Sequence, residues 1–212
     1  SGNTTDRTVA HSLSAVPYFY TYQQATQAAG KVVYHKYNDA SGAPDNLTLN
    51  DTNAASDHAF WHLDTHPTSS VFSVGANADV NANGTNNIRV LLWAPIQGFS
   101  KFGSYLGNGN ANGTFIYTGF KPAFVMIKSI TVASWRIWDN KREDYIGNPN
   151  QTTINAQEND VEYDNASVIM DFLSNGFKIR VTGDNDAAEV ITFMAFAEAP
   201  FVNSNGVPCN AV

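Results

Sequence analysis

Three histidines stand four residues apart, at His58, His62 and His66. On a helix, imidazoles at positions i and i+4 lie on one face and can share a metal ion such as zinc. Pro67 follows the last histidine directly, so a helix there would end at once. The competing interpretation is a polar surface loop with Trp61 turned inward, and the sequence favours this loop.

A second oxygen-rich segment resembles the first half of a calcium-binding loop of the EF-hand type. Asp79, Asn81 and Asn83 supply side-chain oxygens at positions 1, 3 and 5, and a glycine follows at position 6. Position 12 is Val90, where such a loop needs a bidentate glutamate. A hairpin turn over Ala82–Gly84 therefore competes with a Ca²⁺ site, and no other cofactor is expected.

Four carboxylates alternate with other residues at Glu158, Asp160, Glu162 and Asp164. In an extended strand they would share one face, where they repel unless they are solvated, bound to a cation or opposite a basic partner. Two carboxylates across a cleft can also hydrolyse glycans, so a glycan depolymerase is one hypothesis. Acidic clusters on exposed loops are common, and the chain has no G-x-S-x-G motif and no phosphate-binding loop. We therefore expect no enzymatic activity.

Four aromatic residues are candidates for binding sugar rings: Trp61, Trp135, Trp138 and Tyr163. An exposed aromatic ring can stack on the apolar face of a sugar, while Asn, Asp and Thr side chains hydrogen-bond its hydroxyl groups. Packing in a hydrophobic core is the competing interpretation for each tryptophan.

The strands that must position these residues are predicted from short apolar or alternating runs bounded by Gly, Asn, Asp or Pro. The predicted strands are 16–22, 31–37, 46–50, 70–74 and 88–94 in the first half, and 114–118, 122–128, 135–139, 168–173, 176–181 and 190–197 in the second. Phe177, Ile179 and Val181 alternate with polar residues, as in a half-buried antiparallel strand. Helix is weakly supported, over Thr21–Ala29.

The strand pattern repeats at an offset of about 105 residues, as between Pro17 and Pro122. A period this long exceeds that of solenoid repeats and matches the size of a domain. We therefore predict an all-β chain of two tandem antiparallel β-sandwich domains, jelly-roll-like and similar in fold. They would occupy residues 1–103 and 104–212, with a Gly- and Asn-rich junction at 102–113. The alternative is one large β domain without internal symmetry.

The composition excludes several classes of partner. With 12 Lys and Arg against 19 Asp and Glu, the net charge is -7, which is unsuited to nucleic acid or to an anionic membrane surface. No apolar run approaches the length of a membrane span, so no membrane insertion is expected. Cys209 is the one cysteine, which leaves no disulfide within the chain.

The residues around the predicted junction are similar to a known family. Gly98–Gly109 and Gly113–Lys128 resemble a β-rich module of tailed-phage tail fibre proteins, which bind receptors and are common in marine and aquatic phages. The further matches are Asp171–Arg180, Ala195–Phe201, Ala10–Leu13, Asn50–Ala54 and Pro67–Gly75. The resemblance spans nearly the whole chain, but Leu91–Ile96 and the histidine-rich segment depart from it.

The resemblance implies a non-enzymatic, extracellular component of the virion that binds a glycan or receptor on the host surface. It also implies other virion chains as partners and a homo-oligomer, with a trimer favoured, in which weak single sites gain from multivalency. The alternative is a purely structural subunit, such as a spacer, a decoration protein or a self-assembling filament. A glycan array with a matched activity assay separates binding from depolymerisation, and solution mass measurement tests for self-association.

Overall fold

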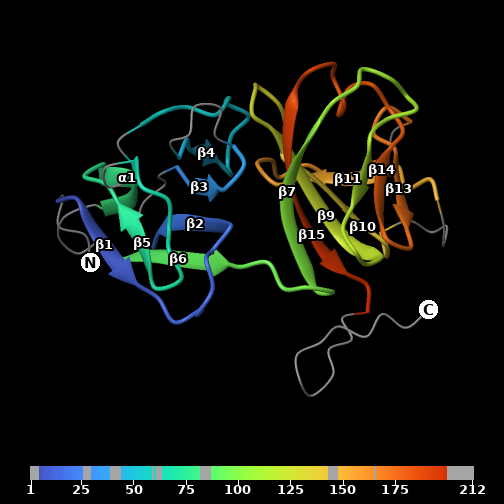
Figure 1. Cartoon of the computed structure of the whole chain (residues 1–212). Coiled ribbons are helices and arrows are strands. Elements are labelled where there is room, and N and C mark those ends of the chain that lie inside the picture. Colours follow the sequence, from blue (N-terminus) through green and yellow to red (C-terminus); the bar gives the residue numbers. More distant parts are fainter. Residues whose placement is uncertain are drawn as a thin grey trace. The chain divides into compact units, whose positions relative to one another are not determined.

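The structure is a computed structural model that describes residues 5–25, 30–38, 44–58, 60, 64–81, 87–142, 148–164 and 166–199 (Figure 1). The described residues form antiparallel sheets and one four-residue helix, so the predicted all-β class is confirmed. The chain divides into two compact units, Ser1–Ala94 (unit 1) and Pro95–Val212 (unit 2). No helix in the described part of the chain is long and apolar enough to cross a membrane.

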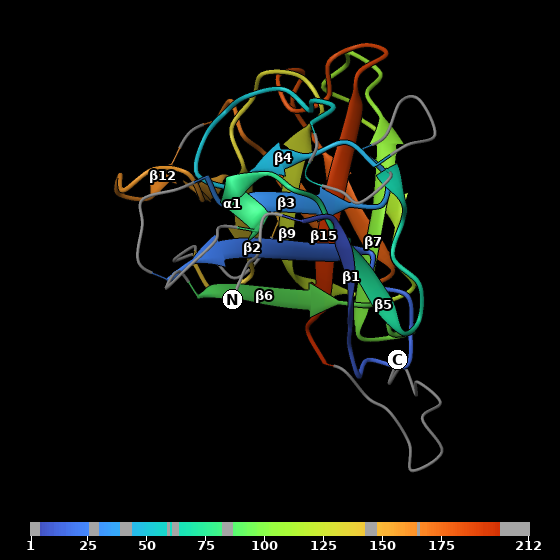
Figure 2. The same ribbon diagram turned by 90° about the vertical axis from the view of Figure 1, so that its left-hand side faces the viewer.

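Unit 1 contains a two-stranded sheet and a four-stranded sheet. The two-stranded sheet consists of β1 (Arg7–Ala10) and β5 (Val71–Val74). The four-stranded sheet has the order β4 (Leu47–Thr48), β3 (Val32–His35), β2 (Phe19–Gln24) and β6 (Ile88–Trp93). Figure 2 shows β3, β2 and β6 side by side. The helix α1 (Ala78–Asn81) follows β5. Tyr20, Tyr34 and Phe72 from the two sheets lie in one buried cluster, so the sheets share a core.

Unit 2 contains a six-stranded sheet and a three-stranded sheet. The larger has the order β12 (Tyr163–Asp164), β11 (Thr152–Asn155), β10 (Arg136–Asp139), β9 (Pro122–Ser129), β15 (Val190–Ala197) and β7 (Ser100–Leu106). The smaller has the order β13 (Met170–Leu173), β14 (Gly176–Ile179) and β8 (Phe115–Tyr117). Val125, Trp138 and Phe193 of the larger sheet pack with Ile116 and Phe177 of the smaller one.

The two units share strand order and register. The order β4–β3–β2–β6 recurs as β11–β10–β9–β15, and the pair β1–β5 recurs as β8–β14. The corresponding cross-strand pairs are Tyr20–Leu92 and Val125–Ala195 in the larger sheets, and Val9–Phe72 and Ile116–Phe177 in the smaller ones. In each of these pairs, the residue of unit 1 and its counterpart in unit 2 are about 105 positions apart in the sequence. The repeated sequence pattern therefore corresponds to the same strand pairing in both units.

The division between the units lies before the predicted boundary at residue 103. Residues 100–106 form β7, which pairs with β15 from Ser100–Phe196 to Leu106–Val190, so they belong to the sheet of unit 2. The glycines of the predicted junction serve close packing. A Cβ atom on Gly107 would lie 2.0 Å from the Asp186 carbonyl oxygen. The Gly- and Asn-rich segment is therefore a packed loop within unit 2.

Other differences from the predicted strands have local causes. The strands β1, β7, β11 and β12 were not predicted, because their runs are short or rich in polar residues and glycine. Residues 21–24 of the weak helix prediction are in β2, and 26–29 lie outside the described residues. Between β13 and β14 the chain reverses at Ser174–Asn175, because Leu173 pairs with Gly176 across a two-residue turn.

Candidate functional site

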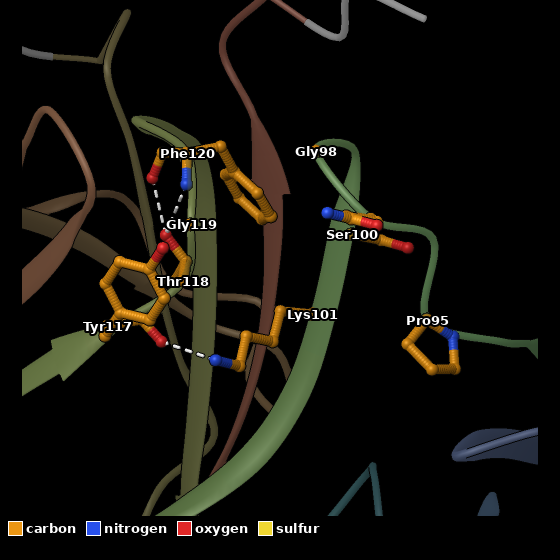
Figure 3. Close-up of a pocket in the computed structure, with 9 residues that line it drawn as sticks. Pro95, Gly98, Ser100, Lys101, Tyr117, Thr118, Gly119 and Phe120 are labelled. Carbon is orange, nitrogen blue, oxygen red and sulfur yellow. Dashed lines mark hydrogen bonds between the residues drawn. The ribbon is translucent and has the colours of Figure 1, made fainter. Parts of the chain in front are cut away.

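An open pocket of about 420 Å³ in unit 2 is the candidate site (Figure 3). Its lining residues are Pro95, Gln97, Gly98, Ser100, Lys101, Tyr117, Thr118, Gly119 and Phe120. They come from two stretches of chain, one leading into β7 and the other ending β8 and turning toward β9. Its volume lies in the range of small-molecule sites, about 300 to 1,000 Å³.

The pocket lies where the edge strands of the two sheets of unit 2 approach each other. β7 is the edge of the six-stranded sheet and β8 is the edge of the three-stranded one. The Thr114 hydroxyl donates to the Leu106 carbonyl oxygen at 3.0 Å, and Lys101 Nζ donates to the Tyr117 carbonyl oxygen at 2.7 Å. These two hydrogen bonds link the strands near both of their ends, so the wall of the pocket is fixed by the fold.

Two turns shape the rest of the pocket. Gly98 has a φ of 73° and Gly119 a φ of 86°, a backbone region that favours glycine because a side chain there is strained. The backbone N–H of Ile96 donates to Ser100 Oγ at 3.0 Å, and the Thr118 hydroxyl donates to the Phe120 carbonyl oxygen. Both hydroxyl groups therefore hold the turns in place.

Two side chains of the pocket can contact a ligand directly: the aromatic ring of Tyr117 and the ammonium group of Lys101. The Tyr117 residue is 58% exposed, and Lys101 Nζ lies 5.1 Å from the centre of its ring. Figure 3 shows Lys101 reaching from β7 to the Tyr117 carbonyl oxygen. The nine lining residues include no carboxylate, histidine or cysteine. The pocket can thus stack, hydrogen-bond and attract an anion, but it has no pair of acids for glycoside hydrolysis.

Sequence reasoning did not single out Tyr117, although a strand was predicted over 114–118. The burial pattern of β8 places Ile116 in the core and Phe115 and Tyr117 outside. The available signal was the alternation around the apolar Ile116, which places its two neighbours on the opposite face of the strand.

The structure corrects the prediction for two of the four aromatic candidates. Trp135 is 2% exposed and Trp138 is fully buried, so neither ring can stack on a sugar. The indole N–H of Trp138 donates to the Val168 carbonyl oxygen at 3.0 Å, which satisfies its one donor inside the core. Trp61 lies outside the described residues, as does the side chain of Tyr163.

The calcium-like segment begins as a helix. The side chain of Asn77 accepts a hydrogen bond from the Asp79 N–H at 2.8 Å and thereby caps α1. Asn81 is fully buried, and its Nδ2 donates to the carbonyl oxygens of Thr5 at 2.8 Å and Gly75 at 3.0 Å. Asn83 lies outside the described residues. Asn81 therefore has a structural role inside unit 1. The argument for a Ca²⁺ site rests only on the similarity of this segment to the first half of an EF-hand loop.

The two described histidines of the predicted cluster, His58 and His66, contact different residues. His66 Nδ1 lies 2.8 Å from the Tyr34 hydroxyl, whereas the ring of His58 packs edge-on against Phe60 at 5.5 Å. His62 lies outside the described residues. In the described part of the chain, no group of three or more His, Cys, Asp or Glu side chains is arranged to hold a metal ion.

The row of four carboxylates does not form one face of a strand. Residues 158–162 have no strand structure, and Asp164 pairs with Thr152 as part of β12. Glu162 pairs with Arg142, and Glu158 accepts hydrogen bonds from Asn155 and Gln157. The condition for a shared acidic face, one strand over 158–164, is not met, because β12 begins only at Tyr163.

A buried acid in unit 2 lies at the turn between β14 and β15. Arg136 Nε lies 2.7 Å from Asp184 Oδ1, while Asp184 Oδ2 is buried and has no hydrogen-bond partner among the described residues. Burial raises the pKa of Asp184 above its ordinary value of 3.8, although Arg136 acts in the opposite direction. Asp186 and Glu189 raise this pKa further by repulsion. Burial has the largest effect, so the pKa of Asp184 is raised despite the contact with Arg136.

Asp184 is expected to make stability depend on pH. Because the folded protein holds this proton more tightly than the unfolded chain does, the contribution of Asp184 to the free energy of unfolding falls as pH rises from 3.8 through the raised pKa. The difference in unfolding free energy between wild type and Asp184→Asn should therefore decline over that window. Urea unfolding at a series of values between about pH 3.5 and pH 7 measures it.

Asp160→Asn, at an exposed position, controls for the removal of one negative charge. A difference between wild type and Asp184→Asn that stays constant across this pH range would contradict the expected proton uptake.

Comparisons with known proteins place the chain in a family. No curated protein and no solved structure matches it. One family model matches residues 1–200, which is nearly the whole chain and includes both units. The chain therefore belongs to the family described as "Domain of unknown function (DUF7483)".

Proposed function

We propose that this protein is a non-enzymatic glycan-binding module, acting as a receptor-binding part of a phage tail fibre on the outside of the virion. The observation that carries the binding proposal is the open pocket with the exposed Tyr117 ring beside Lys101 and with no carboxylate among its lining residues. The similarity of Gly98–Gly109 and Gly113–Lys128 to tail fibre modules supports the location, and these stretches contain most of the pocket.

The chemistry of the pocket suits a sugar better than an apolar ligand. A tyrosine ring offers a flat apolar face on which the apolar face of a sugar ring can stack. The Lys101 ammonium group has further N–H donors beyond its bond to Tyr117. Such a site binds weakly by itself, so several copies on one fibre are needed for firm attachment. A homo-oligomer, with a trimer favoured, meets this need.

A structural subunit is the second candidate function, and exposed apolar residues favour it. Leu106 is 57% exposed on β7 and Phe115 is 44% exposed on β8, and both strands are sheet edges. Exposed edges with apolar side chains are surfaces on which other chains can assemble. Under this candidate function, Leu106 and Phe115 would mediate assembly, and glycans would not bind.

The Tyr117→Ala variant tests the proposed function. We expect wild-type protein, coupled to multivalent beads, to bind a subset of glycans on an array, and Tyr117→Ala to lose about tenfold or more of that binding. Tyr117→Phe keeps the ring and should retain binding. Phe115→Ala is the matched control, because Phe115 lies on the same face of β8 but does not line the pocket.

The same samples separate the alternatives. Release of new reducing ends from a bound glycan would show depolymerase activity and contradict the non-enzymatic proposal. Absence of glycan binding, together with self-association that Phe115→Ala or Leu106→Ala abolishes, would establish the structural subunit instead.

A further inference from the structure

The candidate pocket contains a cation that has no carboxylate partner among the described residues. Lys101 forms no ion pair in this part of the chain, and the only hydrogen bond of its Nζ found there is to the Tyr117 carbonyl oxygen. By contrast, Lys121 pairs with Glu198 at 2.7 Å and Arg180 pairs with Asp171 at 3.1 Å. Lys101 is therefore available to an anion from outside.

Lys101 is also held in a defined position. The hydrogen bond to the Tyr117 carbonyl oxygen uses one of its three N–H donors and fixes the end of a long, flexible side chain. The ammonium group lies 5.1 Å from the centre of the Tyr117 ring, within the range of a cation–π contact. A positioned cation loses less conformational entropy when it binds a ligand than a free lysine does.

The net charge of the chain would not draw an anionic ligand to the pocket. The chain has a net charge of -7, so its overall field repels anionic ligands. An anionic ligand must therefore be attracted by a charge close to it. Lys101 is the one charged residue among the nine that line the pocket. Selectivity for an anion would thus depend on one side chain, which makes it testable.

We propose that the pocket takes a carboxylate-bearing sugar of an acidic glycan, with Lys101 binding the carboxylate and Tyr117 stacking on the sugar ring. This inference rests on the proposed function and adds the class of glycan. An ammonium group adjacent to an aromatic face matches a uronic or sialic acid, which has a charged group next to an apolar ring face. The pocket volume of about 420 Å³ has room for such a unit.

The test uses a printed array of uronate- and sialate-containing oligosaccharides, each beside its methyl ester and beside neutral glycans. The ester keeps the shape of the sugar and removes its charge. We expect wild-type protein to bind the acids about tenfold more strongly than their esters, with a preference that weakens as salt rises. Lys101→Met should abolish this preference, so that the acids bind no more strongly than their esters.

Matched variants separate this inference from the proposed function. Lys121→Met removes one positive charge outside the pocket and should keep the preference for acids. Tyr117→Ala should weaken binding of acids and esters alike. Equal binding of acids and esters by wild type, or neutral glycans as the only bound ligands, overturns the acidic class and leaves glycan binding standing. Absence of binding to every printed glycan overturns the proposed function and this inference together.

Discussion

Phe177→Ala is expected to lower the free energy of unfolding by about 3–5 kcal/mol. Phe177 is fully buried on β14, with its ring 5.4 Å from Phe193 and 6.5 Å from Tyr105. It lies between the two sheets of unit 2, so its loss removes contacts on both sides and leaves a cavity. Urea unfolding followed by tryptophan fluorescence measures the loss, because the buried Trp138 lies in the same core cluster.

Phe115→Ala is the matched control for this core substitution. Phe115 lies on β8, next to β14 in the same sheet, but is 44% exposed. We expect its replacement to change stability by no more than about 0.5 kcal/mol. A loss below about 1 kcal/mol for Phe177→Ala would mean that the two sheets do not enclose one core.

Asn185→Ala is expected to cost about 3 kcal/mol, because the buried amide organises the loop between β7 and β8. Its Nδ2 donates to Asn108 Oδ1 and, at 3.0 Å, to the Asn110 carbonyl oxygen. Its Oδ1 accepts from the Asn108 N–H at 3.3 Å and lies 3.3 Å from the Thr114 hydroxyl oxygen. Asn185 is fully buried, so alanine would remove these hydrogen bonds together and leave a cavity in place of the amide.

Urea unfolding gives the energy of the Asn185 substitution, and hydrogen exchange locates its effect. Exchange should quicken at the amide of Gly109, which donates to the Asn185 carbonyl oxygen at 2.7 Å. Asn159→Ala, at an exposed position, should change stability by less than about 0.5 kcal/mol. If the two variants have equal stability, the amide network contributes nothing.

One wall of the candidate pocket belongs to a part of unit 2 that unit 1 does not repeat, whereas Tyr117 lies on β8, the counterpart of β1. In unit 1 the strand that corresponds to β15 is β6, and β6 is the edge of its sheet. In unit 2 a further strand, β7, pairs with β15 along seven residue pairs. Since Lys101 is on β7 and Ser100 begins it, the additional strand builds one wall of the pocket. The repeated strand β8 and the additional strand β7 thus form the pocket together.

The strands with strong alternation or long apolar runs could be predicted from the sequence. β9, β14 and β15 lie within one or two residues of their predicted bounds, because β-branched and aromatic residues recur there between turn residues. The offset of about 105 residues was also visible, since corresponding core positions such as Phe72 and Phe177 have the same residue type. Local pattern and composition were sufficient for these elements.

Whether several aromatic and polar side chains are buried or exposed could not be predicted, because burial depends on what packs against each side of a strand. Trp138 and Tyr117 are both aromatic strand residues that follow an isoleucine and precede a polar residue, yet one is fully buried and the other 58% exposed. The six-stranded sheet places Trp138 in the core, whereas β8 is an edge strand with its outer face open. Alternation separates the two faces of a strand, but which face is covered depends on the sheet that packs against it.

The sequence by itself determined that the chain is all-β, repetitive, acidic and without a disulfide. Only the tertiary structure decided that the Gly- and Asn-rich segment is a packed loop and that β7 joins unit 2. A glycine pattern predicts a turn or linker, but here Gly103 and Gly107 lie where Phe193 and Asp186 leave no room for a Cβ atom. That requirement arises from residues about 80 to 90 positions away, so it exists only once the chain has folded.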